Sequence, residues 1–449
     1  MTTAILWFRR DLRLSDNPAL VEAIASADDV VGVFCLDQRL LASAGATRRA
    51  FLHDSLRSLH ESMDGALVVR SGDPVEVIPS LAVEVDAASV HVAADFGPYG
   101  RRRDDVVADA VASADIEFVR TGSPYAVDPG SIFTKAGTPY RVFTPFSRVW
   151  RDHGWDDPVR RPSAIPWRRA ESESIPTSPD TGDVELPAAG EDEAHRRLDR
   201  FLRSWVDRYD DDRDRPDRDA TSRLSPDLKW GAVHPRQILA RLGSSAGERT
   251  FATELCWRDF YADVLFHDPD SARTSMNERV GSMPWDTGEG ADESFEAWAT
   301  GQTGYPIVDA GMRQLLAEGW MHNRVRMLVA SFLVKDLHLD WRRGARWFMQ
   351  HLVDGDLASN QHGWQWTAGT GTDAAPYFRI FNPTVQAERF DPDGDYVRRY
   401  VAELADVAGG AVHRPWELDG GPPAGYPLPI VDHAEERDES LRRYQATGS

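Results

Sequence analysis

Residues 5–36 read ILWFRRDLRLSDNPALVEAIASADDVVGVFCL. Two uninterrupted apolar runs, Ile5–Phe8 and Val30–Leu36, begin and end this stretch, and such short runs are typical of strands buried on both faces. Further strand patterns lie at Ala66–Arg70, Ser89–Ala93 and Glu117–Val119, with helical patterns such as Thr47–Met63 and Arg101–Ala114 between them. This alternation predicts an α/β domain over residues 1–150, built on a five-stranded, Rossmann-like parallel sheet. No GxGxxG motif follows the first run, so the usual dinucleotide fingerprint is absent.

The remainder of the chain has a different pattern. Residues 151–195 are rich in Pro, Ser, Asp and Glu, which predicts a long connector between domains. Strand patterns almost vanish after it. Helical patterns occupy residues 196–208, 234–242, 247–265, 306–319, 320–337 and 341–353. We therefore expect an all-α second domain over residues 196–449.

The composition limits the location and the chemistry of the protein. The 449 residues are 41% apolar, which is enough for two cores. We expect a soluble, cytoplasmic protein without a membrane partner, because no apolar stretch of about 18 residues occurs and the N-terminus becomes charged too early for a secretory signal. Cys35 and Cys256 lie far apart and form no metal-binding pattern, so we expect no disulfide and no metal site.

The charge gives a weaker indication. A net charge of −21 opposes binding to nucleic acid, because phosphate contacts depend on basic surface. The total does not describe every face, however, since arginines gather between residues 320 and 350. A local basic surface is therefore compatible with the acidic total.

The segment from Asp354 to Pro383 is rich in glycine and aromatic residues and has no clear helical or strand period. Glycines allow backbone to approach a flat ring system closely. Asp354 and Asp356 are suited to accept hydrogen bonds from a heterocycle or a ribose, and Trp364 and Trp366 supply aromatic surfaces. The segment indicates a redox pocket, and the alternative is an ordinary glycine-rich loop.

A second constellation lies in FATELCWRDFYADVLF, residues 251–266. Glu254, Trp257, Arg258 and Tyr261 follow the spacing of one helix face. A solvent face does not favour the tryptophan, and a core face does not favour the glutamate. This combination favours the wall of a pocket over an amphipathic boundary helix.

Two shorter motifs are less specific. Trp320, Asn323 and Met327 share a helix face that is suited to a planar heteroatom ring, although each is also compatible with packing. The sequence TSRLS at residues 221–225 offers hydroxyls for a phosphate, although such a segment is by itself more often a helix cap.

These motifs together resemble the photolyase/cryptochrome family, and most closely the class I cyclobutane pyrimidine dimer (CPD) photolyases. The resemblance runs nearly end to end, through WFRRDLRLSDNPAL, TPYRVFTPF, TSRLS, ELCWRDFY, GYPIVDAGMRQLLAEGWMHNRVRM and the segment after Asp354. It implies an α/β domain joined by the connector to an all-α domain that holds FAD. The activity implied is that of a deoxyribodipyrimidine photo-lyase.

The resemblance implies a set of FAD-binding residues, with Arg326 paired to Asp354 beside the flavin and Asn360 near flavin N5. The set is Tyr209, Thr221, Ser222, Arg223, Leu224, Ser225, Glu254, Arg258, Asn323, Arg326, Asp354, Gly355, Asp356 and Asn360. The catalytic residues implied at the dimer are Glu254, Asn323, Met327, Trp257 and Trp366. Excited FADH⁻ would pass an electron to a flipped-out dimer, whose poor stacking favours extrusion from the helix.

Further roles follow from the same resemblance. Electron supply would run from Trp364 through Trp341 to Trp285, and DNA contacts would fall to Arg213, Trp257, Arg258, Tyr261, Arg324 and Arg379. An antenna chromophore would lie near Cys35, Asp37, Arg48 and Asp95. We expect 8-hydroxy-5-deazaflavin there, with a folate (MTHF) or FMN as the alternatives.

The partner expected is damaged DNA carrying a CPD, in duplex or single strand, and the protein is expected to be a monomer with no obligate protein partner. The alternatives are a cryptochrome-type blue-light photoreceptor without repair activity and a (6-4) photoproduct repair enzyme. A nucleotide-binding protein without photochemistry would leave the aromatic pocket unexplained. The residues at positions 254, 323, 327, 360 and 366 favour repair of the cyclobutane lesion.

Overall fold

The computed structural model describes residues 1–373 and 376–447 and divides the chain into two compact units. The first unit comprises residues 1–181, 187–207 and 222–269, and the second comprises residues 182–186, 208–221 and 270–449. This division does not coincide with the expected boundaries at residues 150 and 195, because most of the chain between residues 187 and 269 belongs to the same unit as the sheet.

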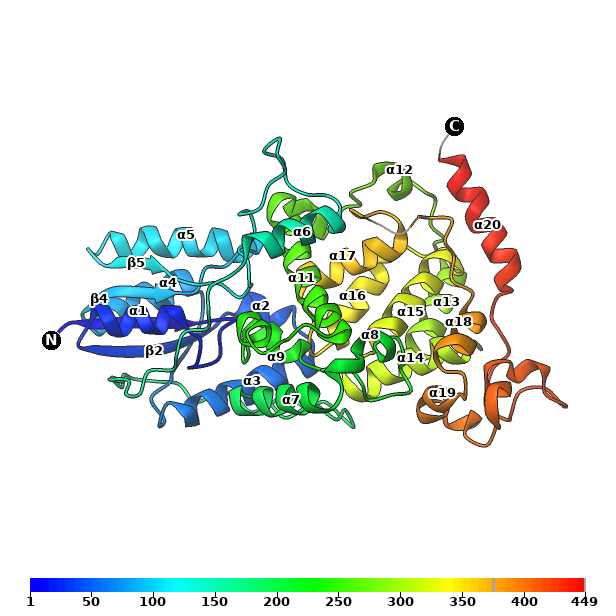
Figure 1. The fold of residues 1–449 in the computed structure, drawn as a ribbon, viewed down its shortest axis with the longest axis horizontal. Coiled ribbons are helices and arrows are strands. Elements are labelled where there is room, and N and C mark those ends of the chain that lie inside the picture. The colour runs from blue at the N-terminus through cyan, green and yellow to red at the C-terminus, as the bar shows by residue number, and fades with distance from the viewer. Residues whose placement is uncertain (374–375, 448–449) are drawn as a thin grey trace. The chain divides into compact units, whose positions relative to one another are not determined.

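A five-stranded parallel sheet forms the centre of the first unit (Figure 1). The strands are β1 (Thr3–Phe8), β2 (Asp29–Leu36), β3 (Val68–Ser71), β4 (Ala87–Val92) and β5 (Glu117–Arg120). Their order in the sheet is β3-β2-β1-β4-β5, and Ile5 of β1 lies beside Val31 of β2 and Val90 of β4. The five expected strands are confirmed, as is the parallel sheet.

Both faces of the central strand β1 are buried. Leu6 and Phe8 belong to a core cluster with residues of α1 and α3, whereas Ile5 and Trp7 belong to a second cluster with residues of α4 and α5. Alternate residues of β1 therefore serve opposite cores, as the period of a strand requires. The helices of this unit are α1 (Pro18–Ser26), α2 (Gln38–Ala42), α3 (Ala46–Ser62), α4 (Pro74–Glu84), α5 (Pro98–Ala112), α6 (Phe143–His153), α7 (Glu191–Ser204), α9 (Ser225–Trp230), α10 (Pro235–Leu239) and α11 (Ala246–His267).

The expected connector is attached to the sheet along part of its length. Val30 of β2 exchanges backbone hydrogen bonds with Pro166 and Arg168, at 2.9 and 2.8 Å. Farther along, the Glu173 N–H donates to the Val69 carbonyl of β3 at 2.9 Å, and the Arg57 guanidinium of α3 donates to the Pro176 carbonyl at 2.7 Å. Through these bonds, backbone groups of the connector find hydrogen-bond partners in β2, β3 and α3, because the connector has no regular secondary structure of its own there.

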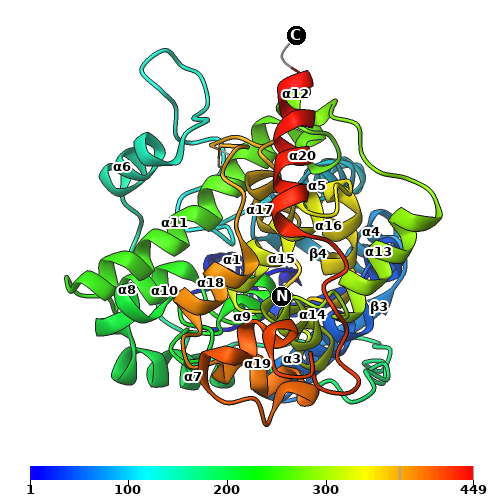
Figure 2. The ribbon, with the colours of Figure 1, turned by 90° about the vertical axis from the view of Figure 1, so that its right-hand side faces the viewer.

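The second unit is helical, and Figures 1 and 2 show its central helices α14, α15, α16 and α17 side by side. Its core contains Trp298, Trp341 and Trp364. The helices are α8 (Tyr209–Asp212), α12 (Glu278–Gly281), α13 (Glu289–Thr300), α14 (Pro306–Glu318), α15 (Asn323–Lys335), α16 (Trp341–His351), α17 (Leu357–Ala368), α18 (Pro383–Phe390), α19 (Asp395–Tyr400) and α20 (His433–Ala446). Short 3₁₀ turns lie at Val206–Arg208, Pro269–Ala272, Ala402–Leu404, Gly409–His413 and Pro415–Glu417.

The segment from Asp354 to Pro383, which has no clear period in the sequence, contains helix α17 in its first half. The Asp356 side chain caps the helix by accepting from the Ser359 N–H at 3.1 Å, and Gly369 ends it in the left-handed conformation. The helical period is hidden because buried residues lie on several sides of α17, which leaves no single apolar stripe to detect.

The sequence also raises the questions of disulfide bonds and of membrane-spanning helices. Cys35 and Cys256 are both buried and free of disulfide bonds. Among the described residues, no helix combines the length and the apolar composition needed to cross a membrane.

Gly231, which follows α9, lies against the backbone of Arg10 in the WFRRDLRLSDN motif, and a substitution there tests how closely the two segments are packed. Its φ is +70°, and an added Cβ would lie 2.0 Å from the Arg10 carbonyl oxygen. We expect Gly231→Ala to lower the free energy of unfolding by about 3 kcal/mol, because a backbone atom cannot rotate away as a side chain can.

The matched control is Gly137→Ala, where φ is +75° but nothing lies within 4 Å of the added Cβ. This variant should lose only about 1 kcal/mol, which is the cost of the left-handed conformation. Denaturant unfolding measures both variants, and equal losses would contradict the proposed backbone clash.

Candidate functional site

Helix α11 presents the first group of expected site residues. The Ser245 side chain accepts from the Glu248 N–H at 3.2 Å, and the Glu248 carboxylate accepts from the Ser245 N–H at 2.9 Å. This reciprocal capping satisfies two of the free N–H groups at the start of the helix. The helix then continues for 22 residues to His267.

The two sides of α11 differ in burial as the spacing predicts. Glu254, Trp257, Arg258 and Tyr261 are half-buried, and the rings of Trp257 and Tyr261 lie 5.4 Å apart. The buried side of the same helix is formed by Phe251, Leu255, Cys256, Asp259, Phe260, Ala262, Asp263, Val264 and Leu265. Within the first unit, α11 therefore has a packed side and a partly accessible side, and the four expected site residues lie on the partly accessible side.

Arg258 has a structural role in addition to the expected one. Its guanidinium donates to the carbonyl oxygens of Pro124 at 2.8 Å and Leu228 at 3.2 Å, and it lies 4.6 Å from the Tyr125 ring. Arg258 thus links α11 to the segment after β5 and to α9. Its contacts to flavin and to DNA stay predictions.

The TSRLS motif forms a turn directly before α9. Arg223 adopts a left-handed φ of +49°, and the Ser222 hydroxyl accepts from the Leu224 N–H at 3.4 Å. Ser225 is the first residue of α9, whereas Thr221 belongs to the second unit. The turn places hydroxyls and backbone groups at a helix start, which suits a phosphate but does not by itself require one.

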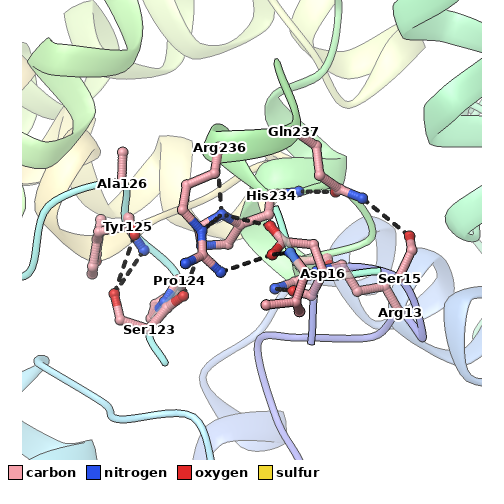
Figure 3. A network of polar contacts seen from close by, with 12 residues as sticks. Arg13, Ser15, Asp16, Ser123, Pro124, Tyr125, Ala126, His234, Arg236 and Gln237 are labelled. Carbon is pink, nitrogen blue, oxygen red and sulfur yellow. Dashed lines mark hydrogen bonds and ion pairs between the residues drawn. The ribbon is translucent and has the colours of Figure 1, made fainter. Parts of the chain in front are cut away.

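A buried ionic network fixes the region that follows this turn (Figure 3). The Arg236 guanidinium of α10 donates to Asp16 Oδ1 at 2.8 Å, and His234 Nδ1 lies 3.3 Å from Asp16 Oδ2. On the other side, the His234 Nε2 contacts the Ser123 carbonyl at 2.8 Å. Arg13 donates to the Gly231 carbonyl at 2.9 Å and to the Asp16 carbonyl at 2.6 Å. The network ties the loop after β1 and the segment after β5 to α10.

The charges in this network are set by burial and by close partners. Burial lowers the pKa of His234 to about 4, so the imidazole is neutral near pH 7. Burial opposes ionisation of Asp16, but the contact with His234 and the charges of Arg13 and Arg236 bring its pKa below the usual value. The WFRRDLRLSDN motif therefore has a structural purpose in this fold, which sequence inspection alone did not assign.

The four expected antenna residues lie beyond or beside the carboxyl ends of the sheet strands, where open α/β sheets bind ligands. The Cys35 thiol is near the Gly72 carbonyl at 3.7 Å, and burial raises its pKa to about 12. Asp37 caps α2 and accepts a hydrogen bond from the Tyr99 hydroxyl. Arg48 is buried in α3 and donates to the Ser43 carbonyl at 3.2 Å.

Asp95 belongs to an ionic cluster at this edge of the sheet. Its carboxylate accepts from the Gly97 N–H at 3.0 Å and from Arg103 at 3.3 Å. Burial opposes ionisation of Asp95, but Arg103, Arg9 and the backbone donor lower its pKa overall. Arg9 and Arg103 also lie 4.8 and 4.9 Å from the Trp7 ring. The cluster therefore gathers charged groups around a buried indole at the carboxyl ends of the strands.

In the second unit, the expected pair of Arg326 and Asp354 is present. The two guanidinium nitrogens donate to the two carboxylate oxygens at 3.3 and 2.8 Å, and Arg326 Nε donates to the Met321 carbonyl at 2.8 Å. A bidentate pair of this kind fixes both side chains in one plane. Buried Gly355 and the helix cap Asp356 follow directly.

The start of α15 carries the next expected residues. His322 caps the helix, with its Nδ1 accepting from the Arg324 N–H at 3.2 Å. Asn323 is exposed, and Met327 is half-buried. Arg324 forms a two-point ion pair with Asp214, at 3.2 and 2.6 Å, so its expected DNA contact would compete with this carboxylate.

The remaining expected residues of this unit differ in burial. Tyr209 is buried, and the Arg213 guanidinium lies 5.9 Å from its ring. Trp366 is half-buried on α17, and Arg379 is exposed while its carbonyl accepts from Lys335 at 3.0 Å. The Asn360 amide donates to the Ala345 carbonyl at 3.1 Å.

The three expected relay tryptophans differ in their surroundings. Trp364 is buried, and its indole N–H has no hydrogen-bond acceptor among the described residues. Trp341 is also buried and donates to the Ser275 hydroxyl at 3.2 Å. Trp285 is half-buried at the edge of the same core. Burial therefore decreases from Trp364 and Trp341 to Trp285.

A family model described as DNA photolyase matches residues 4–163, and one described as the FAD binding domain of DNA photolyase matches residues 251–446. The deoxyribodipyrimidine photo-lyase of Halobacterium salinarum is 40% identical, over 98% of this chain and 98% of that protein. The chain belongs to the photolyase/cryptochrome family.

Solved photolyase structures show the same fold. A bacterial class III photolyase from Agrobacterium tumefaciens has a TM-score of 0.92 and 38% identity, covering 100% of this chain and 98% of that one. An archaeal photolyase from Sulfolobus tokodaii with two FAD molecules has a TM-score of 0.86 and 30% identity, covering 99% and 100%. The class I assignment expected from sequence stays a prediction, since the Agrobacterium structure is described as class III.

The side chains of the expected residues match the chemical needs of FAD. FAD needs acceptors for its N–H and hydroxyl groups and donors for its phosphates. Asp354 and Asp356 carry carboxylates and Asn360 carries an amide, whereas Ser222 and Ser225 carry hydroxyls. The donor and acceptor types match those needs.

Sequence inspection missed three residues that shape the site. Phe143 of α6 stacks on Trp257, Asp259 joins α11 to its neighbours, and His234 anchors α10. The signal for Phe143 was present in the TPYRVFTPF motif, but a motif does not reveal which ring its aromatic residues contact. Asp259 gave a weaker signal, as a charged residue on the apolar side of a helical pattern.

The network around His234 predicts a loss of stability in mild acid. The unfolded chain protonates His234 near its ordinary pKa of 6.5, whereas the folded protein resists protonation down to about pH 4. The contribution of this group is thus present above pH 6.5 and is lost as the pH falls toward 4. Denaturant unfolding at pH 7 and pH 5 should differ by about 2 kcal/mol from this group alone.

The variant His234→Asn keeps an acceptor for the helix cap but removes the titrating ring. At pH 7 the free energy of unfolding of this variant should be lower than that of the natural protein. Between pH 7 and pH 5, the variant should lose about 2 kcal/mol less of its free energy of unfolding than the natural protein does. An unchanged pH dependence would contradict the assignment of the acid sensitivity to His234.

Proposed function

We propose that this chain is a light-driven deoxyribodipyrimidine photo-lyase that repairs cyclobutane pyrimidine dimers in DNA. The observation that carries the proposal is the partly accessible side of α11, which holds Glu254 and Trp257 in a chain 40% identical over 98% of its length to a protein of that name. Packing alone does not explain a glutamate and an indole on one half-buried helix side.

The FAD would be held by the residues that the family resemblance implies. Asp354 and Asp356 would accept hydrogen bonds, Arg326 would hold Asp354 in plane, and the TSRLS hydroxyls would bind phosphate. Tyr209, Arg258, Asn323 and Asn360 would complete the site. Bound and reduced, FAD supplies the light-excited electron that splits the dimer.

The lesion would be held by this chain's own side chains. A dimer stacks poorly, so its extrusion from the helix costs less than that of normal bases. Trp257 and Trp366 would pack against its rings, Glu254 would hydrogen-bond a base, and Asn323 and Met327 would complete the pocket. Arg213, Arg258, Tyr261, Arg324 and Arg379 would contact the DNA strand, so association should weaken strongly with salt.

We propose an antenna chromophore at the edge of the sheet, near Cys35, Asp37, Arg48 and Asp95. The charged groups there, at the carboxyl ends of the strands, are compatible with 8-hydroxy-5-deazaflavin. The two FAD molecules of the Sulfolobus relative also support a flavin as an alternative occupant. We further propose that the protein acts as a cytoplasmic monomer and needs no protein partner.

The test of the main proposal is repair of a thymine-dimer oligonucleotide by the purified, reduced protein under blue light. We expect light-dependent recovery of thymine and none in the dark. A parallel (6-4) lesion should not be repaired at a comparable rate. Flavin binding without any light-dependent repair would overturn the proposal and favour a signalling photoreceptor.

Glu254→Ala tests the role of the carboxyl group on α11. Repair per absorbed photon should fall about tenfold, as expected for one hydrogen bond to a group that becomes charged, and the FAD content should fall less than the repair does. Flavin absorbance in the same preparation separates the two effects. Loss of FAD with unchanged repair per bound flavin would place Glu254 in the flavin site only.

Trp341→Phe tests the proposed relay. Oxidised flavin should no longer be reduced by light in the presence of a thiol reductant, whereas repair by chemically reduced protein should be retained. Flavin absorbance follows both steps. The matched control is Trp298→Phe, which removes a buried indole 6.1 Å from the Trp364 ring but lies outside the proposed relay. Equal loss in both variants would contradict the assignment.

A further inference from the structure

The TPYRVFTPF motif, residues 138–146, has no part in the function proposed above, yet it makes a close contact with the site. Phe143 is the first residue of α6 and is buried. Its ring centroid lies 3.5 Å from that of Trp257, and the two ring planes differ by only 5°. At this separation the faces are in van der Waals contact, so Phe143 covers one face of the indole.

The other aromatic neighbours of Trp257 meet it differently. Phe260 lies 5.8 Å away at an interplanar angle of 76°, and Tyr261 lies 5.4 Å away at 43°. These tilted contacts do not cover the indole as a parallel ring does. Trp257 stays half-buried, so it is open to a further contact while Phe143 supports it from one side.

Several contacts hold α6 firmly against α11 and so fix Phe143. The Trp150 indole donates to Asp259 Oδ2 at 3.0 Å, and Phe146 packs on Phe260 with ring centroids 5.1 Å apart. Arg151 donates to the Thr253 hydroxyl at 2.8 Å. Isolated aromatic pairs favour offset or edge-to-face arrangements over a face-to-face stack, so the stack depends on this support.

We propose that Phe143 is a positioning residue, which fixes the plane of Trp257 and thereby sets how well the protein distinguishes a pyrimidine dimer from undamaged bases. This inference rests on the proposed function. A side chain that is already held in its bound orientation loses little conformational entropy when the dimer arrives. Undamaged bases stay stacked in the helix and do not reach the indole, so their affinity depends on phosphate contacts instead.

The test measures binding in the dark by the reduced holoprotein, with a thymine-dimer oligonucleotide and its undamaged counterpart. Phe143→Leu should weaken binding of the dimer about fivefold, which is the range of one aromatic stacking contact. Binding of undamaged DNA should change less than twofold, and the FAD content should stay constant. Phe143→Tyr keeps the ring and should restore the discrimination.

The matched control is Phe146→Leu, one helical turn away on the same helix. It removes a contact with Phe260 rather than with Trp257, so it should lower stability without changing the discrimination. Should Phe143→Leu fold poorly, Phe143→Met keeps more of the side-chain volume and still removes the ring. A double-mutant cycle combines Phe143→Leu with Trp257→Leu. Removal of the Phe143 ring should have no further effect on the affinity for the dimer once the indole is gone.

The inference is overturned if Phe143→Leu and Phe143→Met bind the dimer as tightly as the natural protein does. It is also overturned if Phe146→Leu loses discrimination equally, since the role would then be general packing. Failure of the proposed function would look different, because the natural protein would itself show neither a preference for the dimer nor repair.

Discussion

The carboxylate of Asp259 is the constraint on which the site in the first unit depends. Its Oδ2 accepts hydrogen bonds from the Trp150 indole and from the backbone N–H groups of Ala126 and Val127, at 3.0, 3.1 and 3.1 Å. One buried acceptor thus joins α6, α11 and the segment after β5. Burial raises the pKa of Asp259 to about 6 against the lowering effects of Arg258 and these donors. A buried acceptor with three donors is costly to disrupt, because its loss leaves each donor unsatisfied.

Because Asp259 holds α11 from its buried side, the two sides of this helix differ in their contacts. Residues on the buried side hold the helix in place, and residues on the half-buried side are those proposed to bind the lesion. Arg258 belongs to both groups, since its guanidinium donates to two carbonyl oxygens while its helix position places it beside Trp257. The network around Asp16 and His234 is a second set of buried polar contacts that holds part of the chain in place. It anchors the segment between the TSRLS turn and α11. Rigid supports of this kind keep a binding surface in its working geometry.

Much of this could be predicted from the sequence. The five strands follow from short apolar runs, and the four residues of α11 follow from helical spacing, because both depend on local periodicity. The pair of Arg326 and Asp354 followed from the family resemblance. Helix α17 could not be recognised, since burial on several sides removes the period. The stack of Phe143 on Trp257 could not be recognised either, because it joins residues 114 positions apart and depends on how two helices pack.

Helix α11 is proposed to present a supported indole and a carboxyl group to a pyrimidine dimer. A crystal structure of the protein bound to duplex DNA with one thymine dimer would reveal whether it does. The dimer is expected outside the helix, against the face of Trp257 opposite Phe143, with the Glu254 carboxyl group in hydrogen-bond contact with a base of the dimer. A dimer that stays within the helix, or that binds away from Trp257 and Glu254, would contradict this proposal.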